Sequence, residues 1–436
     1  MARLIYSLIF TLLMPFIVVR LIMRARKAPA YGQRWWQRFG LFKAPIFQGD
    51  SLSAANPKNG IWFHTVSMGE FIAAAPLIDQ VLQANPDKLM TVTTTTPTGS
   101  EQVQKRFAAE IKQGRVFHVY LPYDLPWLLN GFIRKLAPSL LVILETELWP
   151  NLIHCTKKSG ARVMVINARL SERSAKGYGK VAGLTKTMLE KLDCLAVQNS
   201  TDGNRFLNLG MPVDNMAVTG SIKFDLSIDD ALIEQGKKWR QVWGANRNVV
   251  IVASTHLGED EIALDAFKSV LKHHPDTIMV IVPRHPERFD QVAKLIEQRG
   301  YKLGRRSADT IEPSNQVVLV DTMGELMQFI AASHVCIMGG SFVENGAHNP
   351  LEPAALEVPV LIGPSQFNFA LICEQLENAG GLKTVSEKAL AAELDTWLSD
   401  SSLVKEKGLA AKSVMDANRG AKQKVFELIS AQIKNV

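Results

Sequence analysis

The sequence predicts an α/β protein with two doubly wound parallel sheets, in two domains that face a cleft, preceded by an N-terminal membrane anchor. The 436 residues are enough for two domains of roughly 200 residues each. From Gly60 onward, short β-rich runs alternate with longer helical patterns, which is typical of βαβ units. The alternation pauses between Gly220 and Gly244 and then starts again. A hydrophobic content of 47% is enough to form two cores.

The first element is an apolar run from Leu4 to Val19, which resumes as Leu21 to Met23. Its length is close to the ~20 residues that a membrane-crossing helix needs. Basic residues lie where the cleavage region of a secretory signal is normally neutral, so we predict an uncleaved anchor over residues 1–27. These basic residues are Arg20, Arg24, Arg26 and Lys27. Because the flank richer in Lys and Arg stays in the cytoplasm, the body is expected on the cytoplasmic face. Whether the anchor crosses the bilayer or lies in its interface stays open.

The formal net charge of +7 is concentrated near the N-terminus. Residues 1–49 contain eight basic side chains and no acidic one, which leaves 41 basic and 42 acidic side chains in the remainder. This distribution favours a membrane surface over a nucleic acid, which would need a basic stripe on the folded body. Four aromatic residues interleaved with basic ones predict a second contact with the headgroup layer, or else an amphipathic helix packed on the body. They are Trp35, Trp36, Phe39 and Phe42.

Eleven apolar runs are predicted as strands. Those of the first domain are Ile61–Val66, Met90–Thr95, Val116–Leu121, Leu140–Leu144, Arg162–Asn167 and Cys194–Gln198. Those of the second domain are Val249–Ser254, Ile278–Pro283, Val317–Asp321, Val335–Met338 and Pro359–Ile362. Residues 400–436 are predicted to be helical. Since open α/β sheets bind ligands beyond the carboxyl ends of their strands, the residues that follow these runs are the candidates for function.

Patterns for a metal or a common cofactor are missing from the sequence. It contains no H-E-x-x-H, no D-x-D, no P-loop and no G-x-G-x-x-G after its first strand. The cysteines are far apart and are predicted to be reduced core thiols. They are Cys155, Cys194, Cys336 and Cys373. We therefore expect neither a metal ion nor a cofactor.

Carboxylates and guanidinium groups follow three strands of the first domain. Glu70 starts a helix after the first strand, where it can act as a base or simply cap the helix. Glu145 and Glu147 follow a buried strand and can bind sugar hydroxyls, steady a base or cap the next helix. Arg169 and Arg173 can hold phosphates in bidentate fashion or belong to a solvated ion-pair loop.

The second domain shows three turns of the kind that hold a nucleotide. Arg284 lies at a strand end, where a phosphate would sit, and Thr322-Met323-Gly324-Glu325 follows the next strand. Gly339-Gly340-Ser341 follows a third strand, and its glycines allow close approach of backbone N–H groups to an anion. Glu352 can accept hydrogen bonds from ribose hydroxyls. Three such turns at successive strand ends predict a nucleotide site.

Taken together and in order, these motifs resemble the Kdo transferase family, GT-B enzymes that transfer 3-deoxy-D-manno-octulosonic acid (Kdo). The resemblance also covers the N-terminal anchor. The motifs are Val66-Ser67-Met68-Gly69-Glu70, Glu145-Thr146-Glu147-Leu148-Trp149-Pro150-Asn151, Asn167-Ala168-Arg169-Leu170-Ser171, Ser254-Thr255-His256-x-Gly258-Glu259, Pro283-Arg284-His285-Pro286-Glu287-Arg288 and Asn349-Pro350-Leu351-Glu352-Pro353.

The resemblance implies a Rossmann-like acceptor domain over 28–225, a Rossmann-like CMP-sugar domain over 226–436, and Glu70 as the general base. The residues implied to contact CMP are Pro283, Arg284, Met323, Gly324, Glu325, Asn349, Pro350, Leu351 and Glu352. Four further residues are candidates for acceptor or sugar contacts: Glu145, Glu147, Arg169 and Arg173. The implied reaction is inverting transfer of Kdo from CMP-Kdo to the lipid A precursor (lipid IVA) at the bacterial inner membrane, in lipopolysaccharide core biosynthesis.

Two alternatives remain at this point. A GT-B enzyme that uses a UDP-sugar and a membrane-lipid acceptor would share the fold and the location, and its nucleotide preference would distinguish it. A membrane-bound nucleotide-sugar receptor without turnover would retain binding and biological activity after replacement of Glu70.

Overall fold

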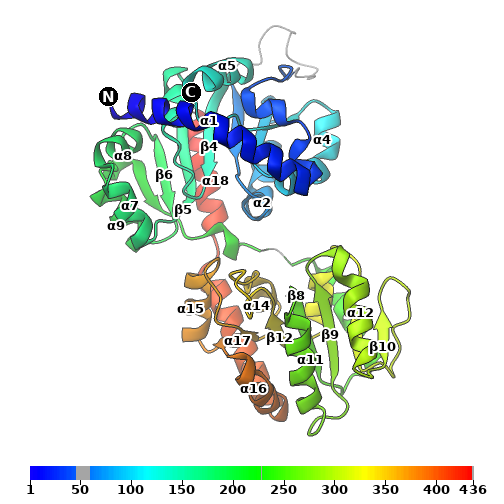
Figure 1. Cartoon of the computed structure of the whole chain (residues 1–436). Helices are drawn as coiled ribbons and strands as arrows, with labels where there is room; N and C mark the ends of the chain where they lie inside the picture. The colour runs from blue at the N-terminus through cyan, green and yellow to red at the C-terminus, as the bar shows by residue number, and fades with distance from the viewer. Residues whose placement is uncertain (46–58, 227, 435–436) are drawn as a thin grey trace. The chain divides into compact units, whose positions relative to one another are not determined.

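The computed structural model describes residues 1–45, 59–226 and 228–434 (Figure 1). The chain forms two compact units, one of Met1–Ile222 with Gly420–Val436 and one of Lys223–Arg419. Each unit contains a seven-stranded sheet in which all paired strands run parallel. The predicted fold class, two doubly wound parallel sheets and an N-terminal apolar helix, is confirmed.

The first sheet has the strand order β3-β2-β1-β4-β5-β6-β7. Its strands are β1 (Gly60–His64), β2 (Met90–Thr94), β3 (Val116–Tyr120), β4 (Pro138–Leu144), β5 (Arg162–Ala168), β6 (Cys194–Val197) and β7 (Met216–Val218). The order reverses between the neighbours β1 and β4, so their carboxyl ends form the topological switch point at which such sheets bind ligands. Both strands are covered on two faces, which explains why their sequences are continuously apolar.

Helices cover both faces of the first sheet. They are α1 (Ala2–Lys27), η1 (Pro29–Gly32), η2 (Trp35–Phe39), α2 (Met68–Ala84), α3 (Pro97–Arg106), α4 (Ala108–Lys112), α5 (Pro126–Leu136), α6 (Pro150–Lys158), α7 (Glu172–Gly179), α8 (Ala182–Leu189), α9 (Ser200–Asn208) and η3 (Val213–Asn215). The short η4 (Ile222–Phe224) lies where the chain passes from the first unit to the second. Two apolar clusters, one on each face, form the core. By length and composition α1 could cross a membrane, and it is the one helix of the described chain that meets that test.

The second sheet has the strand order β10-β11-β9-β8-β12-β13-β14. Its strands are β8 (Val249–Thr255), β9 (Ile278–Pro283), β10 (Leu303–Arg305), β11 (Val317–Leu319), β12 (Val335–Met338), β13 (Val360–Ile362) and β14 (Leu382–Thr384). The covering helices are α10 (Asp230–Trp243), α11 (Glu259–Val270), η5 (Pro286–Arg288), α12 (Phe289–Gln298), α13 (Leu326–Ala331), α14 (Leu351–Ala355), α15 (Ala370–Asn378), α16 (Glu387–Ser399) and α17 (Ser401–Ala417). Here the switch point lies between β8 and β12.

The C-terminal segment departs from the predicted domain range 226–436. It divides at Gly420, whose φ of +94° is readily adopted by glycine, into α17 and α18 (Ala421–Lys434). α18 belongs to the first unit, where Val425 and Ile429 enter the same apolar cluster as Ile61 of β1. The amphipathic pattern of 400–436 correctly indicates helix, but it does not reveal which core receives the apolar face.

The aromatic segment after α1 contacts the body on one side and is exposed on the other. Phe39 packs edge-on against Tyr123, and Phe42 lies 5.0 Å from Phe132 between ring centroids. Trp35 and Trp36 are 45% and 47% exposed. The segment therefore combines both sequence interpretations, because it packs on the body and still presents two indole rings to its surroundings.

Candidate functional site

Glu70 lies in the first turn of α2, directly beyond the carboxyl end of β1. Its backbone N–H donates to Ser67 Oγ at 3.3 Å, and Ser67 Oγ donates to Glu70 Oε1 at 2.9 Å. Glu70 Oε2 accepts from the backbone N–H of Val66 at 2.8 Å. This is a variant of the capping box, in which the carboxylate accepts from Val66, the residue before the N-cap Ser67, so the capping role considered from the sequence is real. It also orients the carboxylate, and each oxygen keeps lone-pair capacity for another partner.

The environment of Glu70 suits a base that works near neutral pH. Burial raises the pKa of Glu70 to about 7, helped by the negative charges of Glu145 and Glu147 and opposed by the hydrogen bonds from Val66 and Ser67. A group with a pKa near the working pH is the most effective general base. Capping alone would not require this crowding of carboxylates.

Glu145 and Glu147 follow β4, the neighbour of β1 at the switch point. Glu145 adopts a φ of +54°, and its backbone N–H donates to the Ile166 carbonyl at 2.9 Å. Glu147 Oε2 accepts from Trp149 Nε1 at 2.9 Å. Burial raises the pKa of Glu147, and the charge of Glu145 adds to the effect. The structure therefore gathers the three predicted carboxylates into one acidic cluster.

Only one of the two arginine candidates joins this cluster. Arg169 Nε lies 3.5 Å from Glu145 Oε2, with 45% of the arginine side chain exposed. Arg173 is an exposed residue in the first turn of α7, without a hydrogen bond or ion pair to any described residue. Arg169 can thus balance the acidic cluster, whereas Arg173 lies apart from it.

In the second unit, histidines gather beyond the carboxyl ends of β8 and β9. His256 Nε2 and His348 Nε2 are 2.9 Å apart with parallel rings, and His285 meets His256 edge-on with 5.3 Å between centroids. A nitrogen–nitrogen hydrogen bond needs one donor and one acceptor, so at least one ring of the pair is neutral. The pKa of His348 is lowered to about 3, mainly by burial and in addition by the charges of His256 and Arg284.

Arg284 follows β9, as the sequence predicts, and its backbone N–H donates to the Thr255 carbonyl at 3.0 Å. Its positive charge lowers the pKa of His348. Burial raises the pKa of Glu352, and the charge of Arg284 opposes part of that rise. The guanidinium thus lies within electrostatic reach of the loops after β9 and β12, beside the switch point of this sheet.

The glycine turn after β12 does not offer free N–H groups to an anion, contrary to the sequence interpretation. Glu259 Oε2 accepts from Gly340 N at 2.7 Å, while its Oε1 accepts from Ser341 N and Phe342 N, both at 3.0 Å. Oε2 also accepts from His256 N at 2.8 Å. A buried carboxylate of the chain itself therefore occupies the place where a phosphate was expected, and it ties the loop after β8 to the loop after β12.

The predicted turn Met323-Gly324-Glu325 lies beyond β11. Met323 is 58% exposed, and Gly324 has a φ of +87°. Glu325 Oε1 accepts from Arg306 Nη2 at 3.0 Å and from Gln328 Nε2 at 2.8 Å. Burial alone would raise the pKa of Glu325, but these hydrogen bonds and one from Thr322 outweigh it and lower the pKa. Glu325 is thus an ionised, well-anchored acceptor.

The segment from Asn349 to Glu352 leads into α14. Asn349 Oδ1 accepts from Leu351 N at 3.2 Å, and Asn349 Nδ2 donates to Glu352 Oε1 at 3.4 Å. Pro350 is the N-cap residue, and the Leu351 side chain is buried in the core of the unit. Leu351 therefore positions the segment, and its side chain is not available to a ligand.

The sequence reasoning missed the roles of His256, His348 and Glu259. His256 and Glu259 belong to a motif of the family resemblance, and the run Glu259-Asp260-Glu261 is typical of the first turn of a helix. Their position directly after a central strand was the available signal. Among the described residues, no group of three His, Cys, Asp or Glu side chains is arranged to hold a metal ion.

The chain is similar to known proteins over its whole length. Residues 33–226 match the family described as 3-deoxy-D-manno-octulosonic-acid transferase (kdotransferase). The 3-deoxy-D-manno-octulosonic acid transferase of Haemophilus influenzae is 38% identical over 100% of this chain and 99% of its own. The enzyme of the same name from Bordetella pertussis is 34% identical over 85% of both chains.

A solved structure supports the fold independently. The glycosyltransferase of Rickettsia africae is 15% identical, with a TM-score of 0.56 over 87% of this chain and 100% of its own. At this identity the similarity concerns the fold alone. The full-length sequence relationship carries the functional conclusion: the chain belongs to the 3-deoxy-D-manno-octulosonic acid transferase family and is a glycosyltransferase of lipopolysaccharide biosynthesis.

Proposed function

We propose that this enzyme transfers Kdo from CMP-Kdo to the lipid A precursor lipid IVA with inversion, and that Glu70 is the general base. The observation that carries the proposal is the orientation of the Glu70 carboxylate together with its raised pKa. Two hydrogen bonds orient its carboxylate at the switch point of the first sheet, and its pKa is raised to about 7. A carboxylate so placed is ready to accept a proton from a hydroxyl at neutral pH.

In the proposed reaction, Glu70 removes the proton of an acceptor hydroxyl while the oxygen attacks the anomeric carbon of Kdo. The bond between that carbon and the phosphate oxygen breaks through an oxocarbenium-like transition state, and CMP leaves with the electron pair. Glu145 and Glu147 lie within electrostatic reach of this carboxylate, and Arg169 pairs with Glu145. All three are proposed to contact the acceptor or the sugar. The more remote Arg173 is a weaker candidate for the same role.

The second unit is proposed to bind the donor. Arg284 would stabilise the single phosphate of departing CMP through charge-assisted hydrogen bonds. The turns at 323–325 and 349–352 are proposed to contact the nucleotide, and Pro283 would shape the strand end. Because one phosphate leaves rather than a diphosphate, a cationic side chain can replace the divalent ion that many sugar transferases use.

The proposed location is the cytoplasmic face of the bacterial inner membrane, with α1 as the attachment. The apolar length of α1 and the basic residues at its end support a membrane role. Attachment to the membrane would keep the enzyme close to a lipid acceptor, since such an acceptor cannot readily leave the bilayer.

The direct test is Kdo transfer to lipid IVA by the wild type and by Glu70→Gln, with CMP-Kdo and EDTA present. We expect a loss of ~10²-fold or more in the variant, because general-base catalysis contributes about that much, with unchanged binding of CMP. Glu172→Gln is the control, since Glu172 is an exposed carboxylate in the first turn of another helix of the same unit, α7.

Other outcomes would redirect the proposal. Full transfer by Glu70→Gln would reject Glu70 as base and move the search to Glu145 and Glu147. Transfer from a UDP-sugar, with none from CMP-Kdo, would favour the alternative donor. Loss of transfer with EDTA, restored by a divalent ion, would reject the metal-free mechanism.

A further inference from the structure

The start of α1 is fixed to the body of the first unit by polar side chains. Arg3 Nη1 donates to Asn151 Oδ1 at 2.8 Å, and Asn151 Nδ2 donates to Ser7 Oγ at 3.0 Å. Tyr6 hydrogen-bonds to Asp124. The two body residues, Asn151 and Asp124, are 0% and 1% exposed. These contacts are specific, because buried polar groups demand partners and an apolar helix has few to offer.

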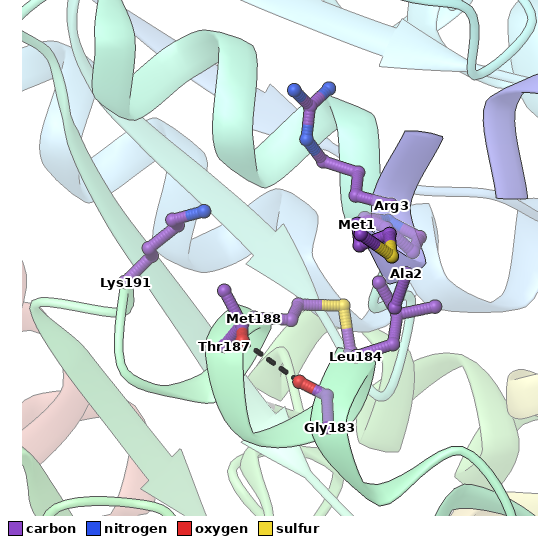
Figure 2. A pocket seen from close by; sticks show the side chains of 9 residues that line it. Met1, Ala2, Arg3, Gly183, Leu184, Thr187, Met188 and Lys191 are labelled. Atoms are coloured by element: carbon purple, nitrogen blue, oxygen red, sulfur yellow. Dashed lines mark hydrogen bonds between the residues drawn. The ribbon is translucent and has the colours of Figure 1, made fainter. Parts of the chain in front are cut away.

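The same docking forms a small open pocket, shown in Figure 2. It has a volume of about 150 Å³ and lies between the first residues of α1, the start of α6 and helix α8. Leu184 and Met188 supply its apolar wall, while Arg3 and Lys191 supply positive charge. Lys191 Nζ lies 2.9 Å from His154 Nδ1. The first turn of α1 therefore lies against two helices of the enzyme body, α6 and α8, and beside Lys191.

The other end of α1 is fixed to the same unit. The Arg24 guanidinium lies over the Tyr31 ring at 4.4 Å, which ties the end of α1 to η1. Further along, Arg38 Nη2 donates to the Thr95 carbonyl at 2.9 Å, and Arg34 hydrogen-bonds to Ser100. The chain thus reaches the β2–α3 region of the body at Arg34, seven residues after the end of α1 at Lys27.

These two attachments are difficult to reconcile with a helix that crosses a bilayer. At 1.5 Å per residue, the 26 residues of α1 span about 39 Å, more than the ~30 Å of a hydrocarbon core. A crossing would place Arg3 and Arg24 on opposite sides of the membrane. Since both ends contact one folded unit, they must lie on the same side whenever these contacts are present.

The face of α1 that points away from the body is apolar along its whole length. Leu4, Leu8, Leu12 and Phe16, spaced by one helical turn, are 61–73% exposed. Val19, Ile22 and Met23 continue this surface. The opposite face carries the docking residues. An apolar stripe on a helix whose other face is docked is suited to the boundary between headgroups and acyl chains.

Positive charge lies at both ends of this stripe. Arg3 and Lys191 are at the start, and Arg20, Arg24 and Arg26 are at the end. A spanning helix is expected to carry its basic residues mainly at the cytoplasmic end. Cations at both ends instead match an anionic headgroup layer that runs beside the full length of the helix.

We propose that α1 is an interfacial helix that lies along the surface of an anionic bilayer, with its exposed face at the acyl boundary and both ends on the side of the enzyme body. The inference rests on the membrane association proposed above. Asn151, which docks α1, follows the Glu145–Glu147 loop by only four residues, so the helix would hold the acidic cluster close to the surface that contains a lipid acceptor.

The test is the sidedness of the N-terminus. A short flexible tag with one cysteine is added before Met1 of the full-length enzyme, and intact spheroplasts and inside-out vesicles are treated with a membrane-impermeant maleimide. We expect labelling in inside-out vesicles only. Labelling in intact spheroplasts would show that α1 crosses the bilayer and would overturn the proposal.

Glu172→Cys is the matched reporter for the body, because Glu172 has an exposed side chain in the same unit. The enzyme without an added cysteine provides the background, since its four cysteines are buried. Retained Kdo transfer confirms that each variant is folded. The readout is topology rather than turnover, so a failure of the proposed reaction and a failure of this inference can be told apart.

A second measurement reads the depth of α1 directly. Spin labels at Ile5, Leu12 and Val19, all exposed on α1, are compared by accessibility to oxygen and to a polar relaxing agent in vesicles containing anionic lipid. An interfacial helix gives three similar, shallow depths. A spanning helix gives a deep Leu12 between two shallow ends, and that pattern would refute the proposal.

Discussion

The switch points of the two sheets occupy the same place in the topology but carry opposite chemistry. Beyond β1 and β4 lies the acidic cluster of Glu70, Glu145 and Glu147, in which burial and mutual repulsion raise pKa values. Beyond β8 and β12 lie His256 and His348, in which burial and neighbouring positive charge lower pKa values.

The comparison shows that burial and neighbouring like charges favour the neutral forms of the ionisable side chains in both sites. Burial disfavours a charge of either sign, and like charges disfavour each other, so acids become weaker and bases become weaker. The parallel sheets provide only the position, since both place loop residues beyond their carboxyl ends. The loop residues decide whether that position serves proton removal or anion binding.

The largest effect that separates the two sites is expected from Glu259→Gln. Its carboxylate accepts four backbone N–H groups at the second switch point, and the first switch point has no such internal anion among its described residues. Loss of these charge-assisted bonds should destabilise the second unit by about 3 kcal/mol or more. Urea unfolding, followed by a probe in that unit, measures the change.

Glu261→Gln is the control for this prediction, because Glu261 lies in the same first turn of α11 but outside this network. Equal stability of both variants and the wild type would show that the network of Glu259 contributes little.

The next effect is expected from Arg284→Gln, which tests the anion-binding side of the comparison. A hydrogen bond to a charged group contributes about 1.5–3 kcal/mol, so the Kd for CMP should rise by roughly 10- to 150-fold. Isothermal titration calorimetry measures it, with Arg299→Gln as control because Arg299 pairs with Asp265 on α11. Unchanged affinity for CMP would place the phosphate elsewhere.

A smaller effect is expected from Glu145→Gln on the pH dependence of transfer. The base must be deprotonated, so kcat/KM should rise with pH through the Glu70 pKa of about 7. The Glu145 charge contributes to raising that pKa. Removal of this charge should therefore shift the rising limb of the kcat/KM profile to lower pH. A limb that stays in place would show that Glu145 does not tune Glu70, even if the maximal rate changes.

The effect of His348 is the smallest at neutral pH, because it appears only when the protein is acidified. Its folded pKa of about 3 lies below the value of 6.5 for the unfolded chain, so the unfolded state binds the proton first as the pH falls. The stabilisation is complete above pH 6.5 and declines below it, by at most about 1.4 kcal/mol per pH unit. NMR should show an uncharged ring from pH 7 to 5, with His348→Asn to assign its signal. An imidazolium in that range would contradict the burial argument.

Most of the strands could be predicted from the sequence, because central parallel strands are continuous apolar runs. The missed strands β7, β10 and β14 are three residues long, too short for a periodicity to show. All three are also edge strands of their sheets. Edge strands are covered less completely, and their sequences carry a weaker signal.

The candidate site could be predicted in part. Glu70, Glu145 and Glu147 are strand-end carboxylates, so their meeting follows from parallel topology once the strands are known. The occupation of the Gly340–Phe342 N–H groups by Glu259 could not be read from spacing, because the two segments are some 80 residues apart and only the pairing of β8 with β12 joins them.

What the sequence by itself determined is the fold class and the place of the reactive groups. Apolar runs of this length satisfy their backbone groups only in buried sheets, and parallel sheets present loops at one edge. What only the tertiary structure decided is how distant segments share partners: α18 joins the first core, Glu259 fills an anion position, and Asn151 holds α1. These choices depend on complementarity between surfaces far apart in the chain, which no local pattern encodes.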